Sequence, residues 1–167
     1  MLIKFLFIIG MFGIYYYMFE SIFNCFISNR NKIFVEHDFR LIGMSSLWMI
    51  LVGSLTGATI YFIYLIPLVH NSIPIIFLII LFGVVITGYE LLTGILLDTL
   101  LKIRLWNYSN EFLNYKGYIS LPRCLAWSLL VPIILWISDN FNYILFSKGN
   151  ITWLLNYYTR IVSDFIK

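Results

Sequence analysis

Two glutamates, Glu20 and Glu90, each lie inside a hydrophobic run long enough to cross a lipid bilayer. An ionised carboxylate is costly in hydrocarbon, since insertion scales put an acidic residue at the centre of a helix at roughly 2.5–3.5 kcal/mol. Acidic groups inside membrane spans therefore usually face a protein interior or a wet cavity. Both glutamates are candidate sites for a proton, a cation or the amine of a solute.

The two glutamates are expected at matching depth in the membrane. Each lies shortly before the expected end of its helix, at Phe26 and Leu97. At about 1.5 Å per residue, each carboxylate is then roughly 10 Å inside the same membrane surface. Carboxylates brought together can share a proton or hold a cation, because like charges strongly raise one pKa. The alternative is that each glutamate forms its own local bonds.

Small and polar residues follow Glu90 and precede it at near-helical spacing. Gly83, Thr87 and Gly94 belong to this stripe, and Thr93 lies beside it. Small residues let membrane helices approach closely, and hydroxyl groups add hydrogen bonds between them. The stripe predicts either a polar inward face or a packing seam alone.

Polar and aromatic residues border the hydrophobic runs. Tryptophan and tyrosine at the end of a span ordinarily anchor it at the membrane surface. Beside two buried acids, such residues also predict a cap over a polar pocket. The predicted binding site consists of Glu20, Glu90, Arg40, Trp48, Thr93, Trp106, Asn107 and Tyr108.

Several kinds of catalytic site are excluded by the sequence. It contains no phosphate-binding glycine loop, nucleophile elbow or HExxH motif, so the chain itself is not an ATPase. His37 is flanked by Glu36 and Asp38, but adjacent residues rarely converge on one metal ion. We expect no cofactor, no metal and no enzymatic activity.

The composition is that of a membrane protein. The chain has 167 residues, 61% of them hydrophobic and 11% charged, with a mean hydropathy of +0.90. A soluble domain of this size needs a more highly charged surface. The net charge of +3 is too small and too dispersed to indicate nucleic-acid binding. The scarcity of alanine beside abundant isoleucine, phenylalanine and asparagine suggests an AT-rich bacterial genome.

The expected fold is all-α, with about four transmembrane helices, since a span needs about 20 apolar residues. A short turn is expected between Pro67 and Pro74, and Pro132 lies inside the last run. The apolar runs cover approximately residues 5–26, 47–65, 73–97 and 119–137.

The C-terminal segment has a different pattern. Apolar residues of 151–167 fall on one helical face and polar residues on the other, which predicts an amphipathic helix in the membrane interface with Trp153 as an anchor. The predicted domains are a four-helix transmembrane domain, 1–138, and an amphipathic tail, 139–167.

Basic residues indicate the orientation. Loops 27–46 and 98–118 hold most of the lysines and arginines between the spans, whereas the intervening turn holds none. Cytoplasmic loops carry the excess of basic residues, so both loops are predicted to be cytoplasmic in a multi-pass protein of the cell membrane. Lys4 and the basic residues of the tail favour the opposite orientation.

A series of short motifs resembles a known family. In order they are 39–48 (FRLIGMSSLW), 89–94 (YELLTG), 105–109 (LWNYS) and 117–121 (GYISL), followed by Trp127. They resemble those of a bacterial family of ABC-transporter type IV permease-like proteins, and are similar to those of the animal transmembrane protein 229 family. The resemblance implies a four-helix membrane protein with clustered motifs. Asn107 stands where the family usually has Asp, which removes a charge and keeps a carbonyl.

The leading hypothesis is a permease-like transport component in the lipid bilayer. It would assemble as a homo-oligomer, with a partner membrane subunit or with an ATPase. One alternative is a non-transporting scaffold or assembly factor, in which the acids pair with basic groups of a partner helix. Another is an intramembrane enzyme acting on a lipid, with the carboxylates as general acid and base.

Overall fold

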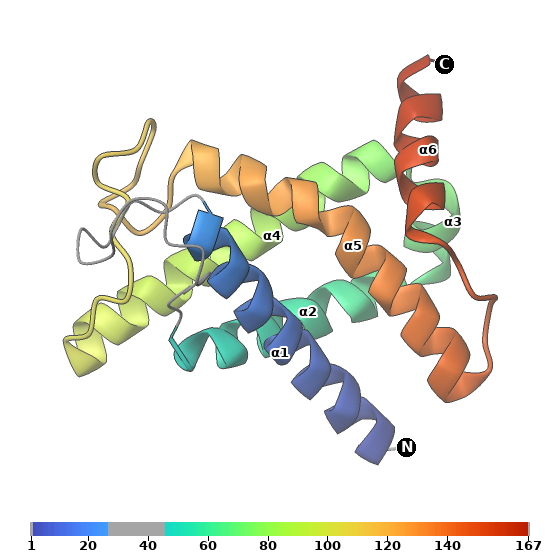
Figure 1. Cartoon of the computed structure of the whole chain (residues 1–167), viewed down its shortest axis with the longest axis horizontal. Helices are drawn as coiled ribbons and strands as arrows, with labels where there is room; N and C mark the ends of the chain where they lie inside the picture. The colour runs from blue at the N-terminus through green and yellow to red at the C-terminus, as the bar shows by residue number, and fades with distance from the viewer. Residues whose placement is uncertain (1, 27–45, 167) are drawn as a thin grey trace. The chain divides into compact units, whose positions relative to one another are not determined.

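The computed structural model describes residues 2–26 and 46–166, and the regular elements within them are helices (Figure 1). The all-α prediction is confirmed. In chain order the elements are α1 (Leu2–Phe26), α2 (Trp48–Tyr64), α3 (Pro67–Ser72), α4 (Ile75–Leu96), the π-helix η1 (Leu97–Leu101), α5 (Leu121–Phe146) and α6 (Leu154–Ile166).

Membrane-spanning helices dominate the fold. Among the described residues, three segments are long and apolar enough to cross a membrane: Leu2–Ile22 of α1, Ile75–Leu101 of α4 with η1, and Leu121–Phe146 of α5. Helix α2 is also apolar but shorter. The chain is therefore a multi-pass membrane protein. Together, the three long helices and α2 make four apolar helices among the described residues, which agrees with the prediction of about four spans.

The element ends differ from the expectation at two places. The segment after Pro67 forms the short helix α3, because proline is well suited to the first position of a helix. Helix α5 continues to Phe146, past the expected end near Ile137, and so runs through the boundary predicted between residues 138 and 139. At its start, the Ser120 hydroxyl accepts a hydrogen bond from the Arg123 backbone N–H and caps the helix.

The chain forms two compact units, Met1–Ala58 and Thr59–Lys167. In the first unit, glycines let α1 and the start of α2 pack closely. A Cβ atom on Gly13 would lie 2.5 Å from the Ile50 carbonyl oxygen, and one on Gly57 would lie 2.4 Å from the Cβ of Phe12. Real side chains do not tolerate these distances, so both glycines belong to a packing seam.

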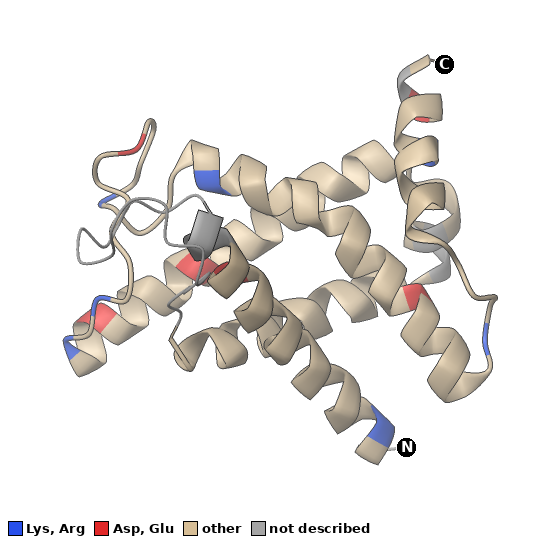
Figure 2. Cartoon of the chain, viewed as in Figure 1, with Lys and Arg blue, Asp and Glu red and all other residues tan. Residues whose placement is uncertain are grey.

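In the second unit, α4 and α5 pack against each other in antiparallel directions. Gly83 lies against Ser128, while Gly94, further along α4, lies against Tyr118, which precedes α5. A later residue of α4 thus contacts an earlier residue near α5, as expected for antiparallel helices. This unit therefore has two distinct ends. Figure 2 shows that most of the ribbon of α4 and α5 carries no charge.

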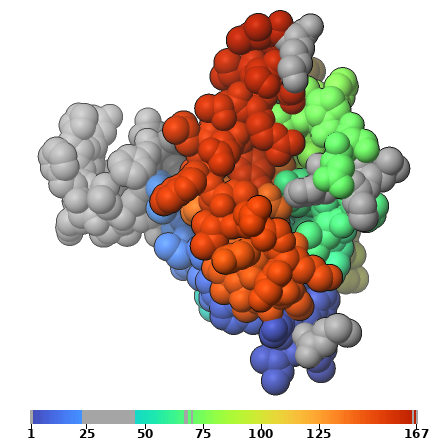
Figure 3. Space-filling model, turned by 90° about the vertical axis from the view of Figure 1, so that its right-hand side faces the viewer, coloured from blue at the N-terminus to red at the C-terminus, as the bar shows by residue number. Residues whose placement is uncertain are grey.

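We define these ends by their residues. The loop end comprises residues 90–123, which run from the last turns of α4, through η1 and the following loop, into the first turn of α5. The tail end comprises residues 64–75 together with 139–166. At the tail end, α6 lies beside the end of α5 and the start of α4 (Figure 3), where Asp164 accepts a hydrogen bond from the Ile75 backbone N–H at 3.2 Å.

Candidate functional site

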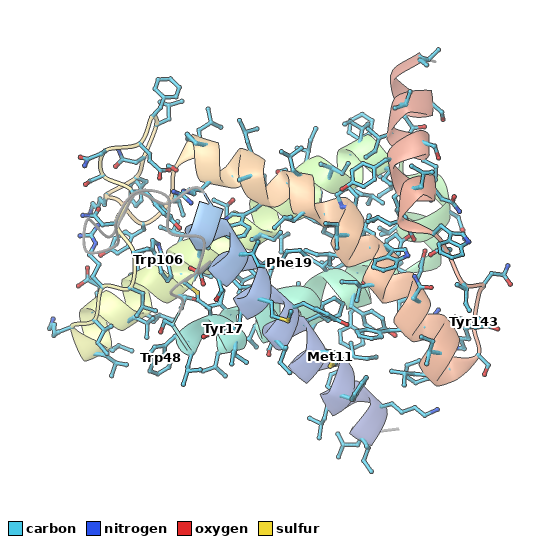
Figure 4. All side chains as sticks on the ribbon, in the orientation of Figure 1. Met11, Tyr17, Phe19, Trp48, Trp106 and Tyr143 are labelled. Atoms are coloured by element: carbon cyan, nitrogen blue, oxygen red, sulfur yellow. The ribbon has the colours of Figure 1, made fainter. Side chains whose placement is uncertain are left out.

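The loop end is held together by aromatic side chains. Trp106 is buried, and its Nε1 donates a hydrogen bond to the Tyr118 carbonyl at 2.7 Å (Figure 4). The Tyr118 hydroxyl donates to Asp98 at 2.7 Å. Tyr115 and Ile119 form an isolated antiparallel bridge. A segment without regular helix is thus fixed against the end of α4 and η1.

A salt bridge closes the loop onto α5. The Arg123 guanidinium contacts Glu111 through Nη2 at 2.8 Å and Nε at 3.0 Å. Such two-pronged pairs are among the stronger and more specific charged contacts. The Ser120 hydroxyl donates to the same carboxylate at 2.5 Å, and the Arg123 Cζ lies 4.9 Å from the centre of the buried Tyr108 ring. The cation therefore has an anion on one side and an aromatic ring on another.

Glu90 belongs to the same cluster. Its side chain is only 1% exposed, and it interacts electrostatically with Arg123. One turn further along α4, a Cβ on Gly94 would lie 2.9 Å from the Tyr118 ring and 3.3 Å from Trp106. Glu90, Trp106 and Tyr108 of the predicted site are thus all buried at the loop end, where Arg123 contacts Glu111 and senses the charge of Glu90.

Two further predicted residues have minor positions at this end. Thr93 is half-buried on α4, next to Gly94. Asn107 is exposed, and its side-chain carbonyl accepts a hydrogen bond from the Ser109 backbone N–H at 3.1 Å. This is a turn-forming bond that an aspartate could make equally well. The departure from the family's usual residue therefore preserves the turn.

The other predicted site residues lie elsewhere in the chain. Glu20 is half-buried on α1, and Trp48 begins α2 with its side chain 38% exposed. Both belong to the first unit, and Arg40 lies outside the described residues. A common site for Glu20 and Glu90 stays a prediction.

Hydrogen bonding affects the chemistry of the loop end. The bond that Tyr118 donates to Asp98 is the main reason that its pKa is raised, with smaller contributions from burial and from the aspartate charge. Tyr118 is therefore a neutral donor at ordinary pH. Within residues 2–26 and 46–166, no three His, Cys, Asp or Glu side chains are grouped so as to hold a metal ion.

The sequence did not indicate a second polar cluster, at the tail end. Tyr64 donates a hydrogen bond to Asp139 at 3.3 Å, and Tyr157 of α6 donates a short one to the same oxygen. Both tyrosines are buried. The pKa of Tyr157 is raised, first by burial and then by its neighbour Tyr64. Because the last apolar run ends near Ile137, the sequence predicts that Asp139 lies outside the membrane domain.

Comparison with known proteins gives one match. A family model described as "Putative ABC-transporter type IV" matches residues 5–166, which include both units. No curated protein and no solved structure matches the chain. The likeness to the transmembrane protein 229 family stays a prediction.

Proposed function

The chain belongs to the family "Putative ABC-transporter type IV", a family of transport-related membrane proteins, and we propose that it is a permease-like subunit working with a partner ATPase. Transport by an ABC system requires ATP hydrolysis. The sequence contains no phosphate-binding glycine loop, so hydrolysis would have to come from another chain. The partner would be a separate ATPase, alone or with a second membrane subunit or another copy of this chain.

The observation that carries the proposal is the buried carboxylate of Glu90, which interacts electrostatically with Arg123. Arg123 forms its two-pronged contact with Glu111, so its guanidinium is already paired and does not by itself neutralise an ionised Glu90. Such a cluster can accept a proton, a cation or the ammonium group of a solute at Glu90. The ligand would compete with Arg123 for this carboxylate.

The remaining predicted residues have roles in this proposal. Trp106 and Tyr108 close the site from the loop side, and Thr93 supplies a hydroxyl one turn from the carboxylate. Glu20 would be the second acid of the site. Loops 27–46 and 98–118 would face the cytoplasm, which puts the site near the surface where an ATPase docks.

The test uses methylammonium as a probe for a cationic ligand. The full chain is purified in mild detergent, and binding of radiolabelled methylammonium is compared between the wild type and Glu90→Gln. We expect the variant to lose about tenfold in affinity, equivalent to about 1.4 kcal/mol. Asp98→Asn is the matched control, since it removes an acid at the same end while keeping an acceptor for Tyr118. Equal binding by wild type and Glu90→Gln would rule out this role.

A scaffold is the second candidate function, and one observation favours it. Arg123 supplies positive charge to both Glu90 and Glu111, so the buried acid can be accounted for by folding alone. Exposed apolar side chains along α4, including Phe77, Val84 and Leu92, can contact lipid or a partner helix. ATP hydrolysis by material co-purified with the tagged chain separates the two candidates. A permease subunit retains an ATPase, whereas a scaffold retains its partner without ATP hydrolysis.

A further inference from the structure

An open cavity of about 390 Å³ lies at the tail end, away from the cluster around Glu90. Its volume is within the range of about 300–1,000 Å³ that is typical of small-molecule sites. Most of the side chains that line it are polar: Asn71, Asp139, Asn142, Lys148 and Asn150. A cavity with both an acid and a base on its wall favours a ligand that carries both charges.

Asp139, the acidic residue of the cavity wall, is held in a defined orientation. Asp139 accepts hydrogen bonds from Tyr64 and Tyr157, both on its Oδ2 atom. Because the raised pKa of Tyr157 keeps this phenol protonated, it acts as a donor throughout the ordinary pH range. Asp139 also lines the cavity, so its side chain is accessible to a ligand there.

The basic wall is fixed by the end of α5. Ser147 and Gly149 have φ angles of 54° and 78°, in the left-handed region. The backbone N–H groups of Ser147 and Lys148 donate to the carbonyls of Tyr143 and Asn142 and close the helix. The backbone of Lys148 is thereby kept beside that of Asn142, and both residues line the cavity.

The segment that follows is fixed as well. The Asn140 side chain accepts a hydrogen bond from the Thr152 backbone N–H at 3.2 Å, and Trp136 Nε1 donates to the Thr152 carbonyl at 2.7 Å. Thr152 also lines the cavity. Residues 147–152 are therefore held at both ends, and a preformed site loses less freedom when a ligand binds.

Exposed apolar side chains lie next to this wall. Ile151 and Trp153 flank Thr152, Leu155 follows on α6, and the exposed fractions of Trp153 and Leu155 are 74% and 69%. Trp153 directly precedes the amphipathic helix α6, and an exposed tryptophan at such a place in a membrane protein is typical of the level of the lipid headgroups. A cavity at this level would be within reach of lipid headgroups as well as of solutes from water.

We propose that the cavity binds a zwitterion that carries a primary ammonium and an anionic group. Asp139 accepts hydrogen bonds from the ammonium, Lys148 pairs with the anion, and the asparagine amides complete the polar contacts. Two sources share this chemistry: the headgroup of an aminophospholipid and a free amino acid. The site uses none of the residues around Glu90, so it is independent of the function proposed above.

The test measures lipid and amino-acid binding separately. Native mass spectrometry of the purified full chain compares retention of phosphatidylethanolamine with that of phosphatidylcholine, whose quaternary ammonium has no N–H donor. Equilibrium dialysis with glycine examines the soluble source. We expect one of the two ligands to bind, with affinity falling about tenfold in Lys148→Gln and in Asp139→Asn. Lys102→Gln, at the loop end, is the control and should bind as the wild type does.

Each outcome has a definite meaning. Selective retention of phosphatidylethanolamine, lost in both variants, supports a headgroup site. Glycine binding with the same dependence, without lipid selectivity, supports a site for free amino acids. Asp139→Asn could disturb the fold through Tyr64 and Tyr157, whereas Lys148 is exposed and provides a test without that effect. Binding of neither ligand, or unchanged binding in Lys148→Gln, would overturn the proposal.

Discussion

The two ends of the second unit hold their carboxylates in different ways. At the loop end, the Arg123 guanidinium pairs with Glu111 and interacts electrostatically with the buried Glu90. At the tail end, Asp139 receives hydrogen bonds from the hydroxyls of Tyr64 and Tyr157. A charged pair satisfies the acid with an opposite charge, whereas neutral donors leave its charge in place. Under the two proposals above, a cationic ligand at the loop end would compete with Arg123, whereas one at the tail end would add to the existing bonds.

This difference has a consequence for function. Under the proposed permease function, a ligand that displaced the guanidinium would change the contacts that hold residues 102–120 on α5 and so couple binding to a movement of the loop. The tail end has a preformed cavity and is suited to binding without rearrangement.

The largest expected effect comes from removing the guanidinium. Arg123→Gln removes the two-pronged contact with Glu111 and the contact with the Tyr108 ring, and each hydrogen bond to a charged group is worth about 1.5–3 kcal/mol. Unfolding followed by tryptophan fluorescence in detergent measures this loss. Lys102→Gln, which is exposed at the same end, should change stability by less than about 0.5 kcal/mol.

A double variant tests whether Glu90 is the reason. If its unbalanced charge causes the loss, Arg123→Gln combined with Glu90→Gln should be more stable than Arg123→Gln alone. Equal stability of the single and double variants would mean that Arg123 acts only through Glu111 and Tyr108. The electrostatic comparison between the two ends would then be wrong.

A smaller effect is expected at the tail end. Tyr157→Phe removes one hydrogen bond to a charged acceptor, which is worth about 1.5–3 kcal/mol. Tyr158→Phe is the matched control on α6, because its side chain is exposed. Similar losses in both variants, measured by the same unfolding experiment, would show that the bond to Asp139 contributes little.

The contact between α4 and α5 at Gly83 and Ser128 lies between the two ends, so it can be changed without altering either end. A Cβ on Gly83 would lie 1.9 Å from the Ser128 hydroxyl oxygen, so Gly83→Ala should separate α4 from α5 at a cost of about 1–3 kcal/mol. Gly88 on the same helix has open space around it among the described residues. Gly88→Ala should therefore gain up to about 1 kcal/mol through helix propensity. A loss of stability in Gly88→Ala similar to that in Gly83→Ala would argue against close packing of α4 on α5 at Gly83.

The parts of the fold that could be predicted from sequence are those set by hydrophobic length. Helices α1, α2, α4 and α5 follow from their apolar runs because the backbone must satisfy its own hydrogen bonds in lipid. The end of α5 was missed because Ser138, Asp139 and Asn140 interrupt the run. In the structure, the Ser138 hydroxyl and the Asn140 amide bond carbonyls one turn earlier, which keeps these polar residues in the helix.

The candidate site was predictable only where a residue was conspicuous in its context. Glu90 and Trp106 stand out as an acid in a hydrophobic run and as an aromatic residue at a helix end. The pair of Glu111 and Arg123 gave no such signal, because a loop without periodicity brings the two together. Their contact depends on the path of residues 102–120, which hydropathy does not determine.

The smallest effect concerns the pH at which tyrosines at the two ends titrate. Tyr118 has a pKa raised above its ordinary value of 10.0, mainly by its bond to Asp98, so the fold favours the neutral phenol. The resulting stability is present in full below pH 10.0 and is lost as the pH rises through the raised pKa. Ultraviolet absorbance of the phenolate measures this titration. Tyr118→Phe should remove one late-titrating group.

The main cause of the raised tyrosine pKa differs between Tyr118 at the loop end and Tyr157 at the tail end. Asp98→Asn should return the titration of Tyr118 toward the ordinary range, because a hydrogen bond to a charged acceptor is the main cause there. Asp139→Asn should leave the pKa of Tyr157 raised, because burial is the main cause at the tail end. If Asp139→Asn restored an ordinary titration for Tyr157, the aspartate charge would dominate at both ends. The tail-end carboxylate would then interact with its tyrosines as strongly as Asp98 does with Tyr118.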